Sequence, residues 1–249
     1  MGKKSVWCLC NGLVDQENHM PIPWPTINAL MKLSGLSPTS DKDKVHNVDF
    51  DRWVADGKPP TKTYLDKIAA GAQAGDLIIL ITEGHGFCSG LNDKAGDAGV
   101  MMADGPLLDG DLHDRLFTKL PAGCRLLCVF FSCDSGGLAM DVVWRVRVED
   151  EACAKADVKQ IPGDASRIKA DVACFASSRG DQLTLAGDLF FPLEHVAQQP
   201  DVLRLGFCEF LARLQAQQRH VLQHPTILEG YFSSHAVVCM RVGEFCHSS

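Results

Sequence analysis

The stretch CRLLCVFFSCDSGG, residues 124–137, decides the fold of this chain. Leu126 to Phe131 are all apolar and have the length of a strand, which is typical of a central strand in a parallel sheet covered on both faces. Gly136 and Gly137 follow and allow the backbone to turn sharply. Between strand and glycines lies Cys133, whose thiolate would be a nucleophile.

A second stretch of the same design, GDLIILITEGHGF at residues 75–87, precedes the first. Leu77 to Ile81 predicts another buried strand, and Gly84 and Gly86 flank His85. Ligands and chemistry collect at the carboxyl ends of parallel strands. The sequence therefore predicts a thiol and an imidazole at one edge of the same sheet.

The rest of the chain alternates predicted strands with predicted helices, which specifies a doubly wound α/β sheet flanked by helices. The acidic, Gly-rich segment 87–110 and the charged segment 145–170 are predicted to be loops. Thr61 is predicted to cap the second helix. The predicted strands are 5–14, 45–48, 77–81, 126–131, 172–176 and 231–242, and the predicted helices are 24–33, 62–73, 111–120 and 202–218.

Bulk properties set outer limits on the function. The chain has 249 residues, 46% of them hydrophobic, which is ample for the core of a single domain. A net charge of -7 and the lack of long Lys/Arg runs argue against nonspecific nucleic-acid binding. No stretch reaches 18 uncharged apolar residues and no secretory signal is recognisable, so we expect a cytoplasmic protein that does not enter the membrane. Of its eleven cysteines, those in strand-like apolar runs are expected to be buried reduced thiols, namely Cys8, Cys10, Cys128, Cys174 and Cys239.

The two stretches resemble the caspase-fold cysteine peptidases, and among them the metacaspases and bacterial orthocaspases more than the animal caspases. In that family the histidine ends a strand as Ser-Gly-His-Gly, and the nucleophile lies in Asp-Ser-Cys-His-Ser-Gly. The separation of His85 and Cys133 is close to the roughly 50 residues of the caspase pattern. The likeness runs from about Val45 to Gln182 and includes PPTKTYLDKIAAGAQAGDLIIL, DGDLHDRLFTKLPAGCRLLCVFFSC and ACFASSRGDQ.

The resemblance implies a mostly parallel central sheet in one caspase-like catalytic domain covering residues 1–249. It divides the domain into a large-subunit-like part (1–144), a linker or processing loop (145–170) and a small-subunit-like part (171–249). It also allows for a zymogen of a stress or defence pathway, activated by another protease or a regulatory protein. The basic residues that could be cut in the linker are Arg145, Arg147, Lys155, Lys159, Arg167 and Lys169.

The resemblance further implies a cysteine endopeptidase that acts on proteins or peptides. Cys133 would be the nucleophile, and His85 would accept its proton and later protonate the leaving amine. The N–H groups of Gly86 and Cys133 would form the oxyanion hole.

Departures from the family pattern concern the specificity pocket. Metacaspases have an Asp two residues before the nucleophile, where this chain has Phe131, and a Ser two residues before the histidine, where it has Glu83. If Glu83 replaces the missing Asp from the opposite wall of the pocket, the pocket would stay negative and would still suit Arg or Lys at P1. The alternative, which has equal weight, is that Glu83 is a solvated side chain at the end of a strand. Asp134 and Asp181 are further predicted substrate-binding residues, and Arg179 lies where metacaspases often have Lys.

Metal binding has only weak support in the sequence. Carboxylates in and just after the Gly-rich loop offer hard oxygen ligands suited to Ca²⁺, which activates many metacaspases. Their spacing matches no EF-hand, so a solvated acidic loop is favoured and no metal or other cofactor is assigned. The Cys-x-Cys and Cys-x₃-Cys pairs lack partners at zinc spacing. The carboxylates in question are Asp93, Asp97, Asp104, Asp109 and Asp111.

Two alternative functions stay open at this stage. One is a caspase-fold pseudoenzyme that acts as an interaction module, against which the intact pair of His85 and Cys133 argues. The other is a protease of the clostripain or CHAT type, which shares both reactive strands but has a different pocket.

Overall fold

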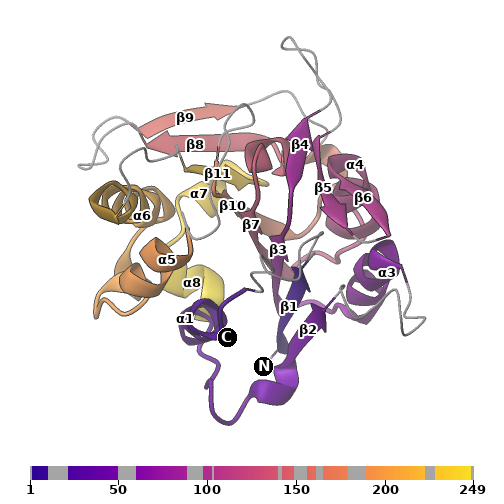
Figure 1. The fold of residues 1–249 in the computed structure, drawn as a ribbon, viewed down its shortest axis with the longest axis horizontal. Coiled ribbons are helices and arrows are strands. Elements are labelled where there is room, and N and C mark those ends of the chain that lie inside the picture. Colours follow the sequence, from indigo (N-terminus) through magenta and orange to yellow (C-terminus); the bar gives the residue numbers. More distant parts are fainter. Residues whose placement is uncertain are drawn as a thin grey trace.

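The computed structural model of the chain is built around one eight-stranded sheet with helices on both faces (Figure 1). It describes residues 2–10, 22–49, 60–88, 98–102, 104–139, 142–148, 156–160, 165–178, 189–221 and 228–247. The strand order is β2-β1-β3-β7-β10-β11-β8-β9. The bounds are β1 Lys4–Cys10, β2 Val45–Asp49, β3 Leu77–Glu83, β7 Arg125–Phe131, β8 Trp144–Val148, β9 Ala156–Gln160, β10 Asp171–Ala176 and β11 Glu229–Phe232.

The five strands from β2 to β10 are parallel, whereas β11, β8 and β9 each run antiparallel to the strand before them in the sheet. Parallel neighbours need crossover connections, and helices supply most of them here. The predicted fold class, an α/β structure with a mostly parallel central sheet flanked by helices, is therefore confirmed.

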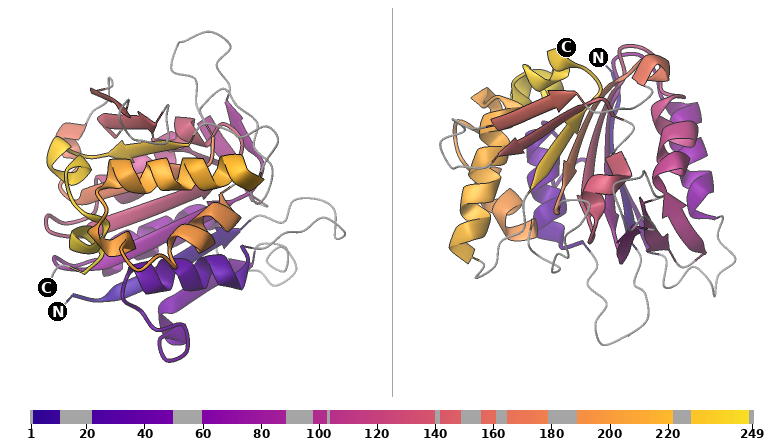
Figure 2. Two further views of the ribbon diagram at one scale, coloured as in Figure 1. Left: turned by 90° about the vertical axis from the view of Figure 1, so that its left-hand side faces the viewer. Right: turned by 90° about the horizontal axis from the view of Figure 1, so that it is seen from above.

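The helices form two layers, one on each face of the sheet (Figures 1 and 2). The first layer contains α1 Trp24–Leu33, α5 Phe190–Val196, α6 Phe207–Val221 and α8 Val242–His247, and the short helix α7 His235–Val238 follows β11. The second contains α3 Thr61–Gly71 and α4 Asp109–Leu112, which continues as the π-helical turn His113–Phe117. Short 3-10 helices span Lys42–Lys44, Ser135–Ala139, Ala165–Arg167 and Val202–Arg204.

The central strands are apolar on both faces because each face is covered by a helical layer. In β3, Ile79 and Ile81 belong to the core cluster beneath the first layer, and Ile78 and Leu80 to the cluster beneath the second. All four side chains are at most 4% exposed. The continuous apolar runs were interpreted in this way from the sequence, and the structure agrees.

The segment 87–110 is not a loop, so that prediction is wrong. It contains most of a second sheet, with three antiparallel strands: β4 Gly86–Cys88, β5 Ala98–Met102 and β6 Gly105–Leu108. Val100, Met102 and Leu107 are buried in the core beneath the second helical layer. The abundance of Asp and Gly in the segment concealed these apolar positions.

The segment 145–170 was expected to lack core elements, and this prediction is also wrong. It contains most of β8 and all of β9, which form an antiparallel pair at one end of the main sheet. Val146 and Val148 are buried, and Arg145 and Arg147, which alternate with them, lie on the other face. The alternation of Val and Arg is a strand pattern that the high charge of the segment obscured.

A buried ion pair joins β8 to β11. Arg147 donates to Oε1 of Glu229 from Nε at 2.9 Å and from Nη2 at 2.5 Å, and the Tyr231 hydroxyl donates to Oε2 at 2.5 Å. Glu229 is 1% exposed, so its charge depends on these partners. Burial and the nearby Glu229 carboxylate raise the pKa of Tyr231 well above its usual value. Arg147 therefore has a structural role inside the sheet.

Several predicted boundaries need correction. The last strand ends at Phe232 rather than residue 242, because Ser234 caps α7 by accepting the Val237 N–H at 3.2 Å. Helix α3 is capped by a side chain from another element, since the Thr61 N–H donates to Oδ2 of Asp104 at 2.8 Å. Thr61 is thus the first helical residue and not the cap. The predicted helix 202–218 begins as a 3-10 turn and becomes α6 only at Phe207.

All ten described cysteines are free thiols, and their burial predicts which of them react. Burial raises the pKa of Cys124 to about 11 and that of Cys246 to about 12, so about one Cys124 thiol in a thousand is ionised at pH 8. We expect iodoacetamide at pH 8 to modify the exposed Cys88 and Cys239 and to spare Cys124 and Cys246 until the protein unfolds. Peptide mapping by mass spectrometry checks this, and modification of Cys246 as fast as of Cys88 would contradict it.

Candidate active site

The strands β3 and β7 end level with each other, and a predicted catalytic residue follows each of them. They are parallel neighbours in which Glu83 and Phe131 are register partners. His85 and Cys133 each lie two residues beyond these partners. Both therefore lie at the carboxyl edge of the sheet, with His85 exposed and Cys133 half-buried. Ligands of open α/β sheets bind at this edge.

The backbones of Gly86 and Cys133 are in direct contact. A Cβ added to Gly86 would overlap the carbonyl oxygen of Cys133 and lie 3.1 Å from its backbone nitrogen. No other residue fits position 86 unless the backbone moves. This contact brings together the two residues whose N–H groups were predicted to form the oxyanion hole.

The second sheet fixes the segment that carries His85. The Met101 N–H on β5 donates to the His85 carbonyl at 2.8 Å, and the β4–β5 pairing continues from Gly86. On its other side β5 packs against the 3-10 helix that follows Cys133, where a Cβ on Gly137 would overlap that of Ala98. The segment that carries His85 and the 3-10 helix that follows Cys133 thus contact the same strand, β5, which lies in a segment that was predicted to be a loop.

The turn after β7 has an unusual backbone. Asp134 has φ +52°, in the left-handed region that L residues seldom adopt and that Asp tolerates better than most. Its carbonyl accepts the Gly137 N–H at 2.9 Å, which starts the 3-10 helix Ser135–Ala139. The half-buried Asp134 thus shapes the nucleophile turn, whatever it contributes to substrate binding.

The predicted pocket residues Glu83 and Phe131 lie side by side. With Cys10 they form one row across β1, β3 and β7, and register partners on parallel strands point to the same face. This face carries the first helical layer, where the Phe131 ring packs on Phe190 of α5 with ring centroids 4.3 Å apart. Glu83 is half-buried and its Oε2 is shielded from solvent. Cys10 was missed because only the strand register reveals its place.

The remaining predicted site residues divide into two groups. Asp181, Arg179, Asp93 and Asp97 lie outside the described residues. Asp104 binds Thr61, and Oδ2 of Asp111 accepts the Leu108 N–H at 3.1 Å. Among the described residues, no group of three or more His, Cys, Asp or Glu side chains is placed to hold a metal ion.

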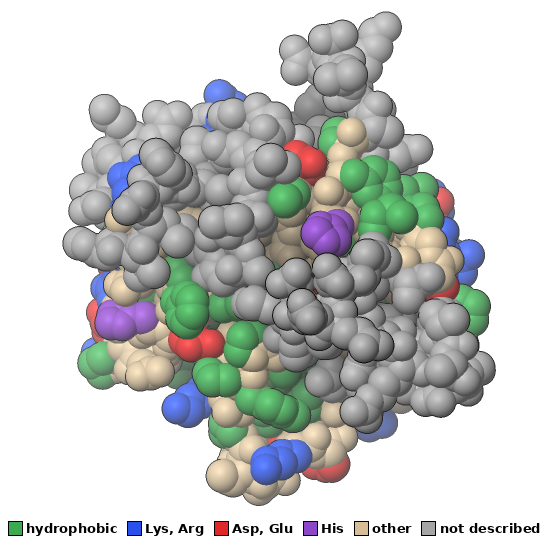
Figure 3. All heavy atoms as spheres, viewed as in Figure 1, with side chains coloured by type: hydrophobic (Ala, Val, Ile, Leu, Met, Phe, Trp, Pro, Cys, Tyr) green, Lys and Arg blue, Asp and Glu red, His purple; other side chains and the backbone are tan. Residues whose placement is uncertain are grey.

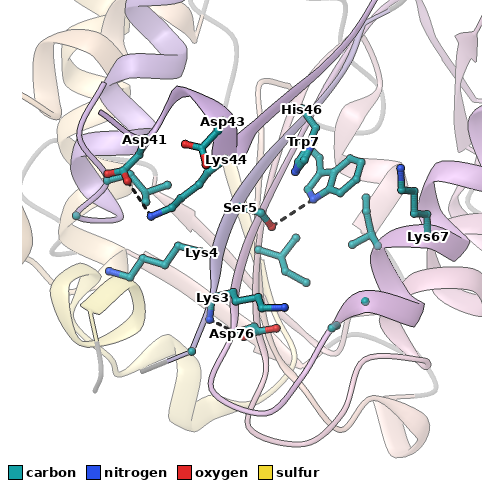
Figure 4. A pocket seen from close by; sticks show the side chains of 17 residues that line it. Lys3, Lys4, Ser5, Trp7, Asp41, Asp43, Lys44, His46, Lys67 and Asp76 are labelled. Carbon is teal, nitrogen blue, oxygen red and sulfur yellow. Dashed lines mark hydrogen bonds and ion pairs between the residues drawn. The ribbon is translucent and has the colours of Figure 1, made fainter. Parts of the chain in front are cut away.

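A pocket at the opposite, amino edge of the sheet is lined by Trp7, His46 and several charged side chains (Figure 4). Trp7 stacks on His46 with centroids 4.0 Å apart. Lys44 pairs with Asp41 at 2.7 Å. These four side chains thus interact in pairs with each other, and the pocket lies at the edge of the sheet opposite to Cys133.

The described surface adds two observations. On the face of Figure 3, Lys and Arg side chains lie singly near the margins. None of the helices in the described part of the chain is both long and apolar enough to cross a membrane.

Comparison with known proteins places the fold. No family model matches the chain. Metacaspase-1 of Yarrowia lipolytica is 36% identical over 77 residues, which cover 28% of this chain and 17% of that protein. Metacaspase-2 of Trypanosoma brucei brucei is 31% identical over 102 residues, which cover 36% and 29%. The chain therefore spans less than a third of the length of these curated relatives.

Two solved structures match along nearly the whole chain. Caspase-1 from Spodoptera frugiperda has a TM-score of 0.53 at 11% identity and covers 91% of this chain and 85% of its own. Protein GSU0716 from Geobacter sulfurreducens has a TM-score of 0.60 at 17% identity and covers 97% and 98%. The chain has the caspase fold. Its distant sequence relatives within that fold are metacaspases.

The Gly86 contact yields a first prediction about the site. For the cysteine peptidase that the sequence resemblance implies, Gly86→Ala should reduce hydrolysis of peptide substrates at least a hundredfold, because the added methyl must push the Cys133 carbonyl away and displace the nucleophile. Gly110→Ala is the matched control, since nothing lies within 4 Å of its new Cβ. Near wild-type kcat/KM for Gly86→Ala would show that the close approach of the two backbones is unimportant for activity.

Proposed function

We propose that the protein is a cysteine endopeptidase that acts through His85 and Cys133. The observation that carries the proposal is the level ending of β3 and β7, which puts an imidazole and a thiol at one sheet edge with the Gly86 and Cys133 backbones in contact. The caspase fold and the distant metacaspase likeness support the same chemistry.

In the proposed reaction His85 takes the proton of the Cys133 thiol, and the thiolate attacks the scissile carbonyl carbon. The N–H groups of Gly86 and Cys133 donate to the oxyanion that forms. His85 then gives its proton to the leaving amine, and the carbon–nitrogen bond breaks to leave a thioester on Cys133. Water, deprotonated by His85, hydrolyses the thioester and regenerates the thiol.

We also propose that the peptidase prefers Arg or Lys at P1. Glu83 supports this preference. It is an acidic residue two positions before His85, and its register partner Phe131 lies two positions before Cys133. Its carboxylate is half-buried and would interact more strongly with a substrate cation than a fully solvated carboxylate would. Phe131 cannot take this part, since its ring is apolar and packed on Phe190.

A peptidyl-Arg acyloxymethylketone probe tests the proposal in one experiment. The probe should label purified protein once, on Cys133, and peptide mapping should locate the adduct. A matched probe with Asp at P1 should label more slowly. A protein that reacts with iodoacetamide at Cys133 but with neither probe would be the pseudoenzyme of the alternative hypothesis. Faster labelling by the Asp probe would contradict the basic preference alone.

A further inference from the structure

Four serines surround the backbone on either side of Cys133. Two come from the nucleophile turn after β7 and two from the end of β10, and each is at most 2% exposed. Buried hydroxyl groups are costly unless they form hydrogen bonds, so their arrangement needs an explanation. These residues, here called the serine cluster, are Ser132, Ser135, Ser177 and Ser178.

The residue before Cys133 is held by two of them. The carbonyl of Ser132 accepts the hydroxyl of Ser177 at 3.1 Å and the hydroxyl of Ser178 at 3.2 Å. Both donors lie just beyond β10, and the Ser177 N–H continues the β7–β10 pairing by donating to the Phe130 carbonyl at 3.1 Å. The amino side of the nucleophile turn is thereby fixed to the neighbouring strand.

The residues after Cys133 are held by one of the same two serines, Ser178. The hydroxyl of Ser135 accepts the Ser178 N–H at 3.2 Å, and the Gly136 N–H donates to the Ser178 carbonyl at 3.0 Å. Ser178 therefore uses its hydroxyl, amide and carbonyl to bind both flanks of Cys133. Ser178, just beyond the end of β10, thus contacts the backbone on both sides of the nucleophile.

We infer that Ser178 and Ser135 are positioning residues that set the location of Cys133 relative to the His85 segment. The inference rests on the proposed peptidase function, to which it adds the groups that orient the nucleophile. The turn contains a left-handed residue, Asp134, and this conformation persists where surrounding contacts over-determine it. Small displacements of a reacting atom lower the rate of a chemical step without weakening substrate binding.

Kinetics of Ser178→Ala test the inference. We expect kcat to fall about tenfold to a hundredfold while KM changes less than about twofold, because the alanine loses the hydroxyl bond to Ser132 but reaches no substrate. Ser233→Ala is the matched control. The Ser233 hydroxyl accepts the Val172 N–H at 2.9 Å at the opposite end of β10, so its loss should cost similar stability and leave kcat unchanged. Each variant is assayed at the same number of degrees below its own melting temperature. Equal kcat values for Ser178→Ala and Ser233→Ala under these conditions would overturn the inference.

Two further measurements keep the inference testable if Ser178→Ala folds poorly or if the wild type cleaves no peptide. Ser135→Ala should give the same split between kcat and KM, and the double variant should fall no further than the worse single variant, since the two hydroxyl oxygens lie 3.4 Å apart and support the same turn. Amide hydrogen exchange in residues 132–137 should be faster in both variants and unchanged in Ser233→Ala. A wild type without peptidase activity would overturn the proposed function, whereas unchanged exchange would overturn the positioning role.

Discussion

Cys133→Ala is expected to abolish peptide hydrolysis while the protein stays folded. The alanine removes the only proposed nucleophile, and no thioester can form without it. The half-buried position tolerates the smaller side chain, so the melting temperature should stay within a few degrees of the wild type. Cys208→Ala is the matched control, because Cys208 is also half-buried but lies on α6. Retention of most activity by Cys133→Ala would refute the assignment.

His85→Ala should be almost as severe. A thiol without its base is a poor nucleophile near neutral pH, and the leaving amine would lack an acid. The double variant with Cys133→Ala should be no worse than Cys133→Ala alone, because members of one catalytic unit are not additive. His235→Ala, on the exposed start of α7, serves as the control.

Glu83→Gln is expected to lower kcat/KM for substrates with Arg at P1 by roughly a hundredfold or more. Loss of the half-buried Glu83 carboxylate leaves the substrate guanidinium desolvated in its pocket and unpaired, at a cost of about 3 kcal/mol or more, and about 1.4 kcal/mol corresponds to a factor of ten. Labelling of Cys133 by a small uncharged thiol reagent should stay near the wild-type rate, because the reagent needs no cation partner.

A P1-scanning peptide library separates this prediction from general damage to the site. Glu83→Gln should lose preference for Arg and Lys while cleavage after uncharged residues changes little. Glu209→Gln, an exposed Glu on α6, should keep the wild-type profile. A wild-type preference for Asp or for large apolar residues at P1 would exclude Glu83 as the specificity carboxylate.

How much of the fold could be predicted from the sequence depended on the residue pattern of each segment. The strands around Ile79 and Val129 were predictable because a strand buried on both faces is continuously apolar. Helix α1 was also predicted with its observed bounds, since Pro25 in its first turn and the spacing of its buried residues are strong signals. That His85 and Cys133 lie at the same edge of the sheet followed from the predicted parallel arrangement of the two strands.

Features that depend on partners distant in sequence could not be predicted. Asp104 caps a helix that begins 43 residues earlier, and Ser178 binds Ser135 across a similar separation. Neither contact leaves a local signature. The strands β5 and β8 did leave one, β5 in the apolar run AGVMM and β8 in the alternation of Val and Arg, but the Asp and Gly residues around β5 and the charge of β8 suggested loops. Composition was there a poorer guide than periodicity.

The interleaved order of the sheet limits what a proteolytic cut could release. β10 and β11 come last of the strands in the chain, yet they lie between β7 and β8. A chain severed between β9 and β10 would leave its carboxyl-terminal piece hydrogen-bonded to the other piece along both sides. Arg145 and Arg147 are inside β8 and so are poor cutting sites, whereas Arg167 is exposed just before β10. Cleavage at such a site would yield a nicked protein whose two fragments separate only under denaturing conditions.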